Sequence, residues 1–174
     1  MSQKTNKPVP RTPDADFIDD DIARRLFEEA YEDQMNGFIA EARILYQRSI
    51  NHYPSAPAYT YMAWLVAQEH KFEDAIELCK KAIELDPAFG NAYNDIGAYY
   101  IELEDFDNAM INLSHALKAK KHHTKAFVYF NLGKVNEHYE NFANAIACYQ
   151  KCLELSPGFQ PATDKVEELQ RGLQ

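Results

Sequence analysis

Three stretches of the chain align with one another: EDAIELCKKAIELDP (residues 73–87), DNAMINLSHALKAKK (residues 107–121) and ANAIACYQKCLELSP (residues 143–157). Each contains a small residue that is followed, four and seven positions later, by residues that also coincide in the alignment. These small residues are Ala75, Ala109 and Ala145, which places the stretches 34 (75 to 109) and 36 (109 to 145) residues apart. A fixed period of this length is the sequence signature of a repeat architecture. The sequence therefore predicts a structural unit that recurs along the chain.

A second pattern of small residues lies twelve positions before the first one. Its members are Ala63, Gly97 and Gly133, and a tyrosine stands four residues before each of them. In the earliest copy, the spacing of Tyr59, Met62, Ala63 and Val66 is that of one packed face of a helix. Each unit is therefore expected to contain two helices, and small residues allow two helices to approach closely.

Together the two patterns resemble the tetratricopeptide repeat signature, W-x2-L-G-x2-Y followed by A-x3-F and a closing proline, with tyrosine in the place of tryptophan. Pro87 and Pro157 stand at the closing positions of two units. The resemblance covers roughly residues 22–172. It implies an all-α fold, a right-handed solenoid of antiparallel helix pairs whose first helices line a concave groove. About 3.5 to 4 repeats and a C-terminal capping helix are expected.

The predicted domain organisation follows these patterns. The repeats are placed at about 22–55, 56–89, 90–125 and 126–159, with a capping helix over 160–172, so that the repeat domain spans 17–174. The first repeat is degenerate, because its second helix matches through Ala42 and Tyr46 whereas the frame of its first helix is open. Pro8, Pro10 and Pro13 lie among polar residues, so residues 1–16 are expected to form a disordered tail.

The charge and cysteine content restrict the class of partner and compartment. A net charge of -9 repels phosphate backbones and anionic lipids, so we expect a neutral or basic protein or peptide partner and no nucleic acid. No apolar run approaches the about 18 residues that a spanning helix needs, so neither membrane insertion nor a secretion signal is expected. Three cysteines are too few for a disulfide framework, which favours a reducing, cytoplasmic location.

No pattern in the sequence predicts catalysis, a metal or a cofactor. Cys148 and Cys152 lie one helical turn apart and could meet His138, but no second metal-ligand pair accompanies them. Glycine-rich phosphate loops, nucleophile elbows and zinc-protease motifs are absent from the sequence. The interpretation is a non-catalytic binding module.

The residues predicted to line the groove are those left on the first helices after the packed faces are removed. They are Phe27, Tyr31, Tyr61, Trp64, Gln68, Asn94, Asp95, Glu102, Phe130, Asn131, Lys134 and His138. Trp64, Tyr61 and Phe130 are large aromatics that the packed faces do not require, which favours a contact surface for an extended or helical peptide. The alternative is that neighbouring repeats bury them.

Two binding modes known in the resembled family can be compared with these residues. Some arrays hold a ligand backbone with a ladder of one asparagine per repeat. In this chain only Asn131 is an asparagine at the ladder position, and the equivalent positions of the two preceding repeats carry Asp95 and Tyr61. Chaperone-docking members clamp a terminal carboxylate with clustered basic residues, whereas Arg24 and Lys134 lie in distant repeats. Neither a continuous ladder nor the capture of acidic chaperone tails is therefore expected.

Three functions remain compatible with the sequence. The favoured one is an adaptor or scaffold whose groove holds a segment of a partner protein. The alternatives are a cytoplasmic chaperone for an exported or secreted protein and a self-associating module that forms a homodimer through exposed aromatics. The basic loop 118–125 is expected to be a solvated connection, with a pH-sensitive docking patch through His122 and His123 as the alternative.

Overall fold

The computed structural model describes residues 12–123 and 125–172 of the chain. Within these residues a short 3-10 helix, η1 (Pro13–Phe17), precedes nine α-helices, and the only extended pairing is an isolated bridge between Phe89 and Lys121. The α-helices are α1 (Asp21–Met35), α2 (Ile39–His52), α3 (Ala56–Ala67), α4 (Phe72–Leu85), α5 (Gly90–Glu102), α6 (Phe106–Lys118), α7 (Lys125–His138), α8 (Phe142–Leu155) and α9 (Gln160–Gly172).

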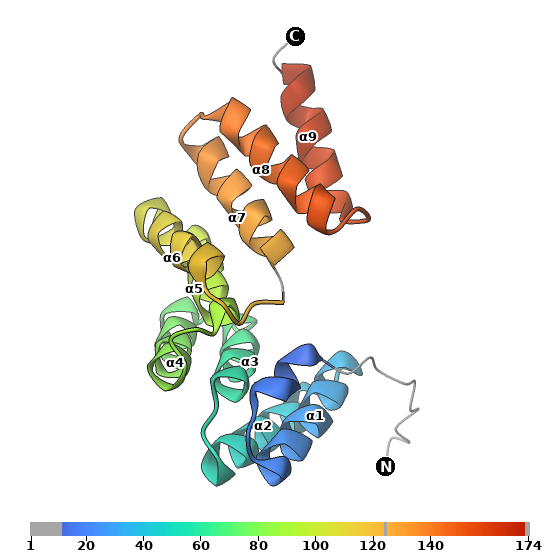
Figure 1. Ribbon diagram of the computed structural model, residues 1–174, viewed down its shortest axis with the longest axis vertical. Helices are drawn as coiled ribbons and strands as arrows, with labels where there is room; N and C mark the ends of the chain where they lie inside the picture. The colour runs from blue at the N-terminus through green and yellow to red at the C-terminus, as the bar shows by residue number, and fades with distance from the viewer. Residues whose placement is uncertain (1–11, 124, 173–174) are drawn as a thin grey trace.

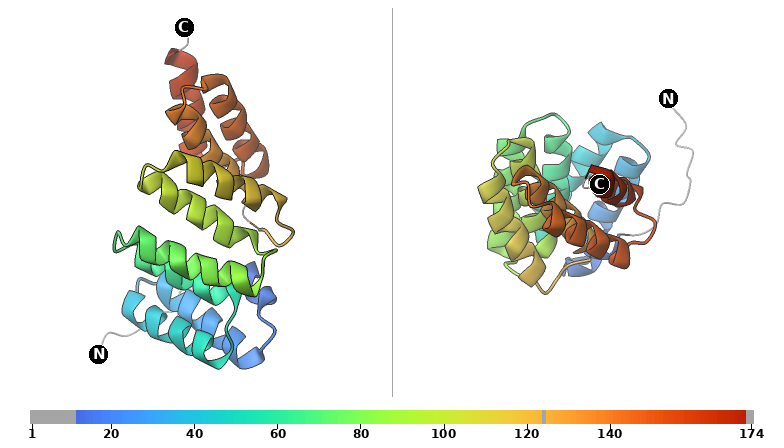
Figure 2. Two further views of the ribbon diagram at one scale, coloured as in Figure 1. Left: turned by 90° about the vertical axis from the view of Figure 1, so that its left-hand side faces the viewer. Right: turned by 90° about the horizontal axis from the view of Figure 1, so that it is seen from above.

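The helices form pairs that stack in chain order (Figure 1). Helix α1 packs against α2, α3 against α4, α5 against α6 and α7 against α8, while α9 packs against α8 at the end of the stack. The first helices also contact one another, α3 with α5 and α5 with α7, so they form one continuous inner layer. Seen from the side, the stack runs from α1 and α2 at one end to α9 at the other (Figure 2). The prediction of an all-α solenoid of helix pairs is confirmed.

None of the helices in residues 12–123 and 125–172 is long and apolar enough to cross a membrane.

Each of two helix pairs is held together where a glycine of the first helix meets a large side chain of the second. A Cβ atom at Gly97 would lie 2.6 Å from the Leu113 side chain, and one at Gly133 would lie 2.3 Å from the Tyr149 ring. Leu113 and Tyr149 are both fully buried. A side chain of the partner helix therefore occupies the space next to each glycine, and this contact fixes the distance between the paired helices.

The turns within the pairs share one backbone conformation. Gly37, His70, Glu104 and Glu140 all have φ between 57° and 82°, the left-handed region, and they occupy equivalent places between the two helices of successive pairs. Only the first of these turns uses glycine, the residue that adopts this conformation without steric cost. The four turns therefore keep the same backbone conformation although the residue type at this position varies.

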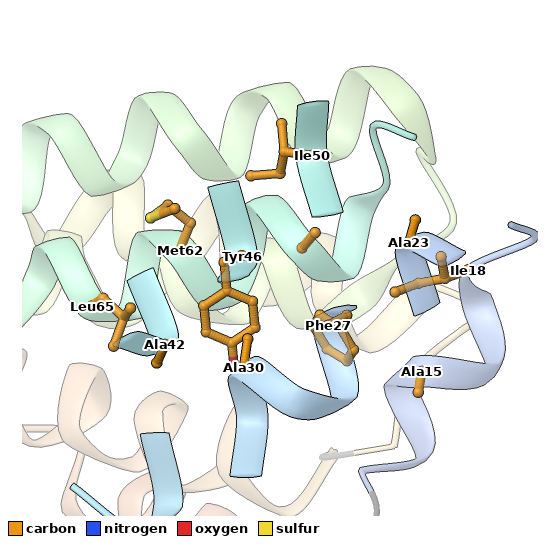
Figure 3. Packing of buried hydrophobic residues seen from close by; sticks show 11 residues of the cluster. Ala15, Ile18, Ala23, Phe27, Ala30, Ala42, Tyr46, Ile50, Met62 and Leu65 are labelled. Carbon is orange, nitrogen blue, oxygen red and sulfur yellow. The ribbon is translucent and has the colours of Figure 1, made fainter. Parts of the chain in front are cut away.

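The first helix pair has a regular core although its sequence pattern is degenerate. Ala30 and Tyr46 are fully buried and belong to one apolar cluster with Phe27, whose ring lies 5.5 Å from that of Tyr46 (Figure 3). Ala30 lies 33 residues before Ala63 (30 to 63), and this relation fixes the frame of α1 that the sequence left open. The degenerate repeat is therefore a complete helix pair.

The residues before α1 differ from the expected disordered tail over 12–16. Ala15 and Ile18 are almost fully buried and join the same cluster as Phe27, as Figure 3 shows. Thr12 caps the 3-10 helix by accepting a hydrogen bond from the Asp14 backbone N–H. The expectation of disorder is wrong for these residues because Ala15 and Ile18 pack against the folded repeats. Composition alone does not reveal such tertiary contacts. Residues 1–11 of the predicted tail lie outside the described residues.

Replacing Gly133 with alanine tests the close contact between α7 and α8. The new methyl group would overlap the buried Tyr149 ring, so we expect the free energy of unfolding to fall by about 1–3 kcal/mol, despite the about 1 kcal/mol by which alanine favours a helix over glycine. The matched control is Gly172→Ala, because nothing lies within 4 Å of a Cβ at that position. Urea denaturation followed by circular dichroism measures both variants. Equal stability of the Gly133→Ala protein and the wild type would contradict the contact.

Candidate functional site

The inner layer of first helices encloses a cavity of about 510 Å³. Its walls come from all four first helices, together with η1 and the start of α4. The lining residues are Asp14, Tyr31, Gln34, Met35, Thr60, Tyr61, Trp64, Phe72, Asn91, Asn94, Asp95, Ala98, Tyr99, Glu102, Phe127 and Asn131. Aromatic side chains, amides and carboxyls predominate, a composition that gives apolar contact area and oriented hydrogen bonding in the same space.

One side of the cavity is completed by the segment before α1. The Asp14 carboxylate accepts hydrogen bonds at one oxygen, Oδ2, from the Tyr61 hydroxyl (3.1 Å) and from the Asn91 side-chain amide (2.8 Å). The Tyr61 oxygen also lies 2.9 Å from the Thr12 hydroxyl. Asp14 thus links α3 to α5 and introduces a carboxyl that the repeats themselves do not supply.

A second hydrogen-bonded chain crosses from α7 to α5. The Asn131 side-chain amide donates to Oδ1 of Asn94 at 3.1 Å, and the Asn94 side-chain Nδ2 donates to the Asp95 carboxylate at 3.2 Å. Asn131 and Asn94 are both buried. The chain orients the Asp95 carboxylate, because each amide in it has one of its hydrogen bonds fixed by its neighbour.

The environment of the cavity raises the pKa of two carboxyl groups, those of Asp95 and Asp14. Burial is the main cause for Asp95, whose pKa rises to about 7, and the nearby Asp14 charge raises it further against the opposing hydrogen bond from Asn94. Burial likewise raises the pKa of Asp14, opposed by its bond from Tyr61 and by His123. Carboxyls whose pKa is raised in a poorly solvated space are a common feature of functional sites.

Aromatic rings and one more carboxylate border the opening. Trp64 retains 39% exposure and Phe127 retains 44%, so both present apolar surface to solvent. Glu102 is exposed at the end of α5 and lies 3.7 Å from the Lys134 ammonium. The rim therefore combines exposed aromatics with a carboxylate that is only loosely paired.

The structure brings seven of the twelve sequence-predicted groove residues to the cavity and places five elsewhere. Those that line it are Tyr31, Tyr61, Trp64, Asn94, Asp95, Glu102 and Asn131. Phe27 is fully buried in the first core cluster, and the Phe130 ring packs against Tyr149 and Phe159. Gln68 is exposed at the end of α3, Lys134 pairs with Glu102, and the His138 ring stacks on Phe106.

Sequence reasoning missed several lining residues, among them Asp14, Asn91, Tyr99 and Phe127. Asn91 stands four residues before Asp95 on the same helix, so helical spacing was a usable signal for it. Phe127 likewise stands four residues before Asn131. Asp14 carries no such signal, because it precedes the repeats and its place depends on tertiary contacts.

The basic loop is tied to the body of the protein by several contacts. Lys121 pairs with Asp86 at 2.7 Å, and the His123 ring stacks on Phe17 with the centroids 5.0 Å apart. Burial lowers the pKa of His122 to about 4, so this residue stays neutral near pH 7. The alternative of a pH-sensitive docking patch therefore loses the contribution of His122.

Metal binding has no support among the described residues. No group of three or more His, Cys, Asp or Glu side chains in them could hold a metal ion. Cys79, Cys148 and Cys152 are free thiols, and burial raises the pKa of all three. A raised pKa keeps a thiol protonated and unreactive.

The repeat pattern and the stacked pairs agree with a known family. Sequence profiles of the tetratricopeptide repeat match residues 56–89, 90–123 and 126–159, which together make up more than half of the chain. The chain belongs to the tetratricopeptide repeat family. Among curated proteins it is similar to the human tetratricopeptide repeat protein 12, with 33% identity over 92 residues, or 53% of this chain and 13% of that protein. The similarity thus spans a small part of that relative's length.

Solved structures share the fold. The pilF protein of Pseudomonas aeruginosa superposes with a TM-score of 0.78 at 20% identity, covering 85% of this chain and 67% of that one. The first tetratricopeptide domain of Spaghetti (RPAP3), solved with the HSP90 peptide SRMEEVD, gives a TM-score of 0.62 at 19% identity and covers 68% of this chain and 92% of that one. These tetratricopeptide neighbours support the same helical solenoid.

The raised pKa of Asp95 predicts a pH-dependent gain in stability for Asp95→Asn. A carboxyl with a raised pKa binds its proton more tightly in the folded state, so stability is lost as pH rises from about 4 towards about 7. The asparagine side chain cannot ionise, so we expect the variant to be more stable than the wild type at pH 8, by up to about 4 kcal/mol, and to match it near pH 4.

The control for this experiment is Asp74→Asn, which removes an exposed carboxylate from the first turn of α4. This variant is expected to show no such gain at pH 8. Urea denaturation of the three proteins at both pH values provides the comparison, and an Asp95→Asn variant less stable than the wild type at pH 8 would refute the assigned environment.

Proposed function

We propose that the chain is a non-catalytic scaffold that holds an extended segment of a partner protein in its cavity. The observation that carries the proposal is the cavity of about 510 Å³ whose walls come from all four first helices. Its size falls within the range of ligand sites, and its walls alternate apolar rings with amides. Such a surface can satisfy both the side chains and the backbone of a peptide.

The polarity of the cavity favours a neutral or basic segment. Asp14, Asp95 and Glu102 contribute carboxyls, and the lining contains no lysine, arginine or histidine. The net charge of -9 acts in the same direction at long range and disfavours nucleic acids. The related domain of Spaghetti was solved with a peptide that ends in Glu-Glu-Val-Asp. An acidic segment of that kind would meet carboxyls here, so we propose a different class of partner for this groove.

The proposed compartment is reducing and cytoplasmic. The three cysteines are free, and Cys79 and Cys152 occupy apolar core positions where a disulfide has no partner. This arrangement suits a compartment that keeps thiols reduced.

The test is selection of a random dodecapeptide phage library on the full chain. We expect enriched peptides to bind the wild type and to lose about 30-fold or more in affinity for Trp64→Ala, because a central aromatic anchor contributes about 2 kcal/mol. Trp64 is the only tryptophan, so a blue shift of its fluorescence should accompany binding.

The matched control is Tyr53→Ala. Tyr53 has a similar exposure of 41% but lies outside the cavity lining. Its replacement should leave peptide affinity unchanged. Peptides that bind the Trp64→Ala variant as tightly as the wild type would show that binding uses another face.

A further inference from the structure

We propose that the cavity contains a subsite for one arginine side chain of the partner, formed by Asp95 with Glu102 at the rim and Asp14 behind it. The inference rests on the proposed function and deepens it, because it names the chemical group that the groove recognises. Asp95 is the partly buried carboxylate on the inner face of α5, and Glu102 lies two turns further along the same helix. Both carboxylates line the cavity, so both attract a cation held in it.

Charge complementarity is the first argument for a cationic group. Three carboxyls face a single space, and no basic side chain of the described chain lines it. Lys134 reaches Glu102 at 3.7 Å from outside the lining, and His123 acts on Asp14, also from outside it. Like charges held together without a counterion oppose folding, and a bound cation would relieve that repulsion.

Two buried polar atoms of the cavity wall point to a ligand rich in N–H donors. Asp14 Oδ1 and the Tyr99 hydroxyl have no hydrogen-bond partner among the described residues. Asp14 is 3% exposed and Tyr99 is 7% exposed. Buried polar atoms rarely lack partners in native proteins, and an unsatisfied one costs free energy. Asp14 Oδ1 is an acceptor and the Tyr99 hydroxyl can accept as well as donate, while a guanidinium carries five N–H donors and no acceptor.

The aromatic walls favour arginine over lysine. Tyr31 lines the cavity from α1, Trp64 from α3 and Phe127 from α7. A planar guanidinium stacks on aromatic faces while its edge binds carboxylates, whereas an ammonium is a compact, strongly hydrated charge. A site that offers both aromatic rings and carboxylates therefore suits a guanidinium better than an ammonium.

The protonation of Asp95 makes binding depend on pH. The groups that act on this carboxyl are Asp14 from η1, Asn94 and Tyr99 from α5, and Cys79 from α4, which is buried and neutral. With a pKa of about 7, Asp95 is mostly neutral at pH 6 and mostly ionised at pH 8. Only the ionised form attracts a guanidinium, so affinity should rise by about tenfold between these values.

The experiment compares two small probes with the full chain, Nα-acetyl-argininamide and its uncharged isostere Nα-acetyl-citrullinamide. Binding is followed by amide NMR shifts and by Trp64 fluorescence. We expect saturable binding of the arginine probe, shifts centred on α5, and about tenfold or more weaker binding of the citrulline probe and of Nα-acetyl-lysinamide.

Variants of the chain connect this binding to the named carboxyls. Asp95→Asn should weaken the arginine probe by about tenfold or more and abolish the pH dependence, while Asp74→Asn should bind as the wild type does. Glu102→Gln, on the exposed rim, provides a second variant and should weaken the probe by a smaller factor. Circular dichroism confirms that each variant is folded.

The subsite is overturned if citrullinamide or lysinamide binds as tightly as argininamide, if Asp95→Asn binds normally, or if no saturable binding occurs. Failure of the subsite is distinguishable from failure of the scaffold. Phage-selected peptides that require Trp64 but contain no essential arginine would leave the scaffold standing and remove the subsite. Binding of the arginine probe, with no peptide enriched from the phage library, would support the subsite and contradict the scaffold.

Discussion

The close contact between a glycine on the first helix of a pair and a large side chain on the second is the constraint on which the rest of the structure depends. Gly97 receives Leu113, and Gly133 receives Tyr149. Because the contact is made on the outer side of the first helices, it directs their opposite faces towards the inner layer. Successive pairs repeat this geometry, so their inner faces join into one surface. The cavity is thus a consequence of pair packing and needs no separate architectural element.

The segment before α1 modifies the surface that the repeats create. It is anchored by Ala15 and Ile18 in the first core cluster, and it directs Asp14 towards Tyr61 and Asn91. A repeat array built from helix pairs alone would lack this carboxyl. The chain therefore gains a local charge feature from a non-repeating segment, which is how arrays with a shared fold come to differ in the ligands they suit.

The limits of sequence-based prediction follow the same division between repeating and non-repeating parts. The periodic small residues predict the helix pairs and the inner faces, and Tyr61, Trp64 and Asp95 follow from them. Phe27 is buried in the core because of the frame that α1 takes, which the sequence left open. Phe130 is half-buried because its ring packs against Tyr149 and Phe159. The position of η1 and the pKa of neighbouring carboxyls depend on contacts between distant residues, which no local pattern encodes.

Interactions that stabilise the fold and groups that cost stability lie on different faces of the helices in this chain. Apolar burial lies between the helices of each pair and between successive pairs, in clusters such as the one around Leu113 and the one around Tyr149. The costly groups, Asp95 and the unpartnered hydroxyl of Tyr99, lie together on the inner layer. Strained or poorly solvated groups persist only where the surrounding structure is stable enough to hold them, and they concentrate at sites of function. In a solenoid, neighbouring pairs supply that stability from the other faces of the same helices, so the inner layer can keep poorly solvated carboxyls, as the proposed arginine subsite requires.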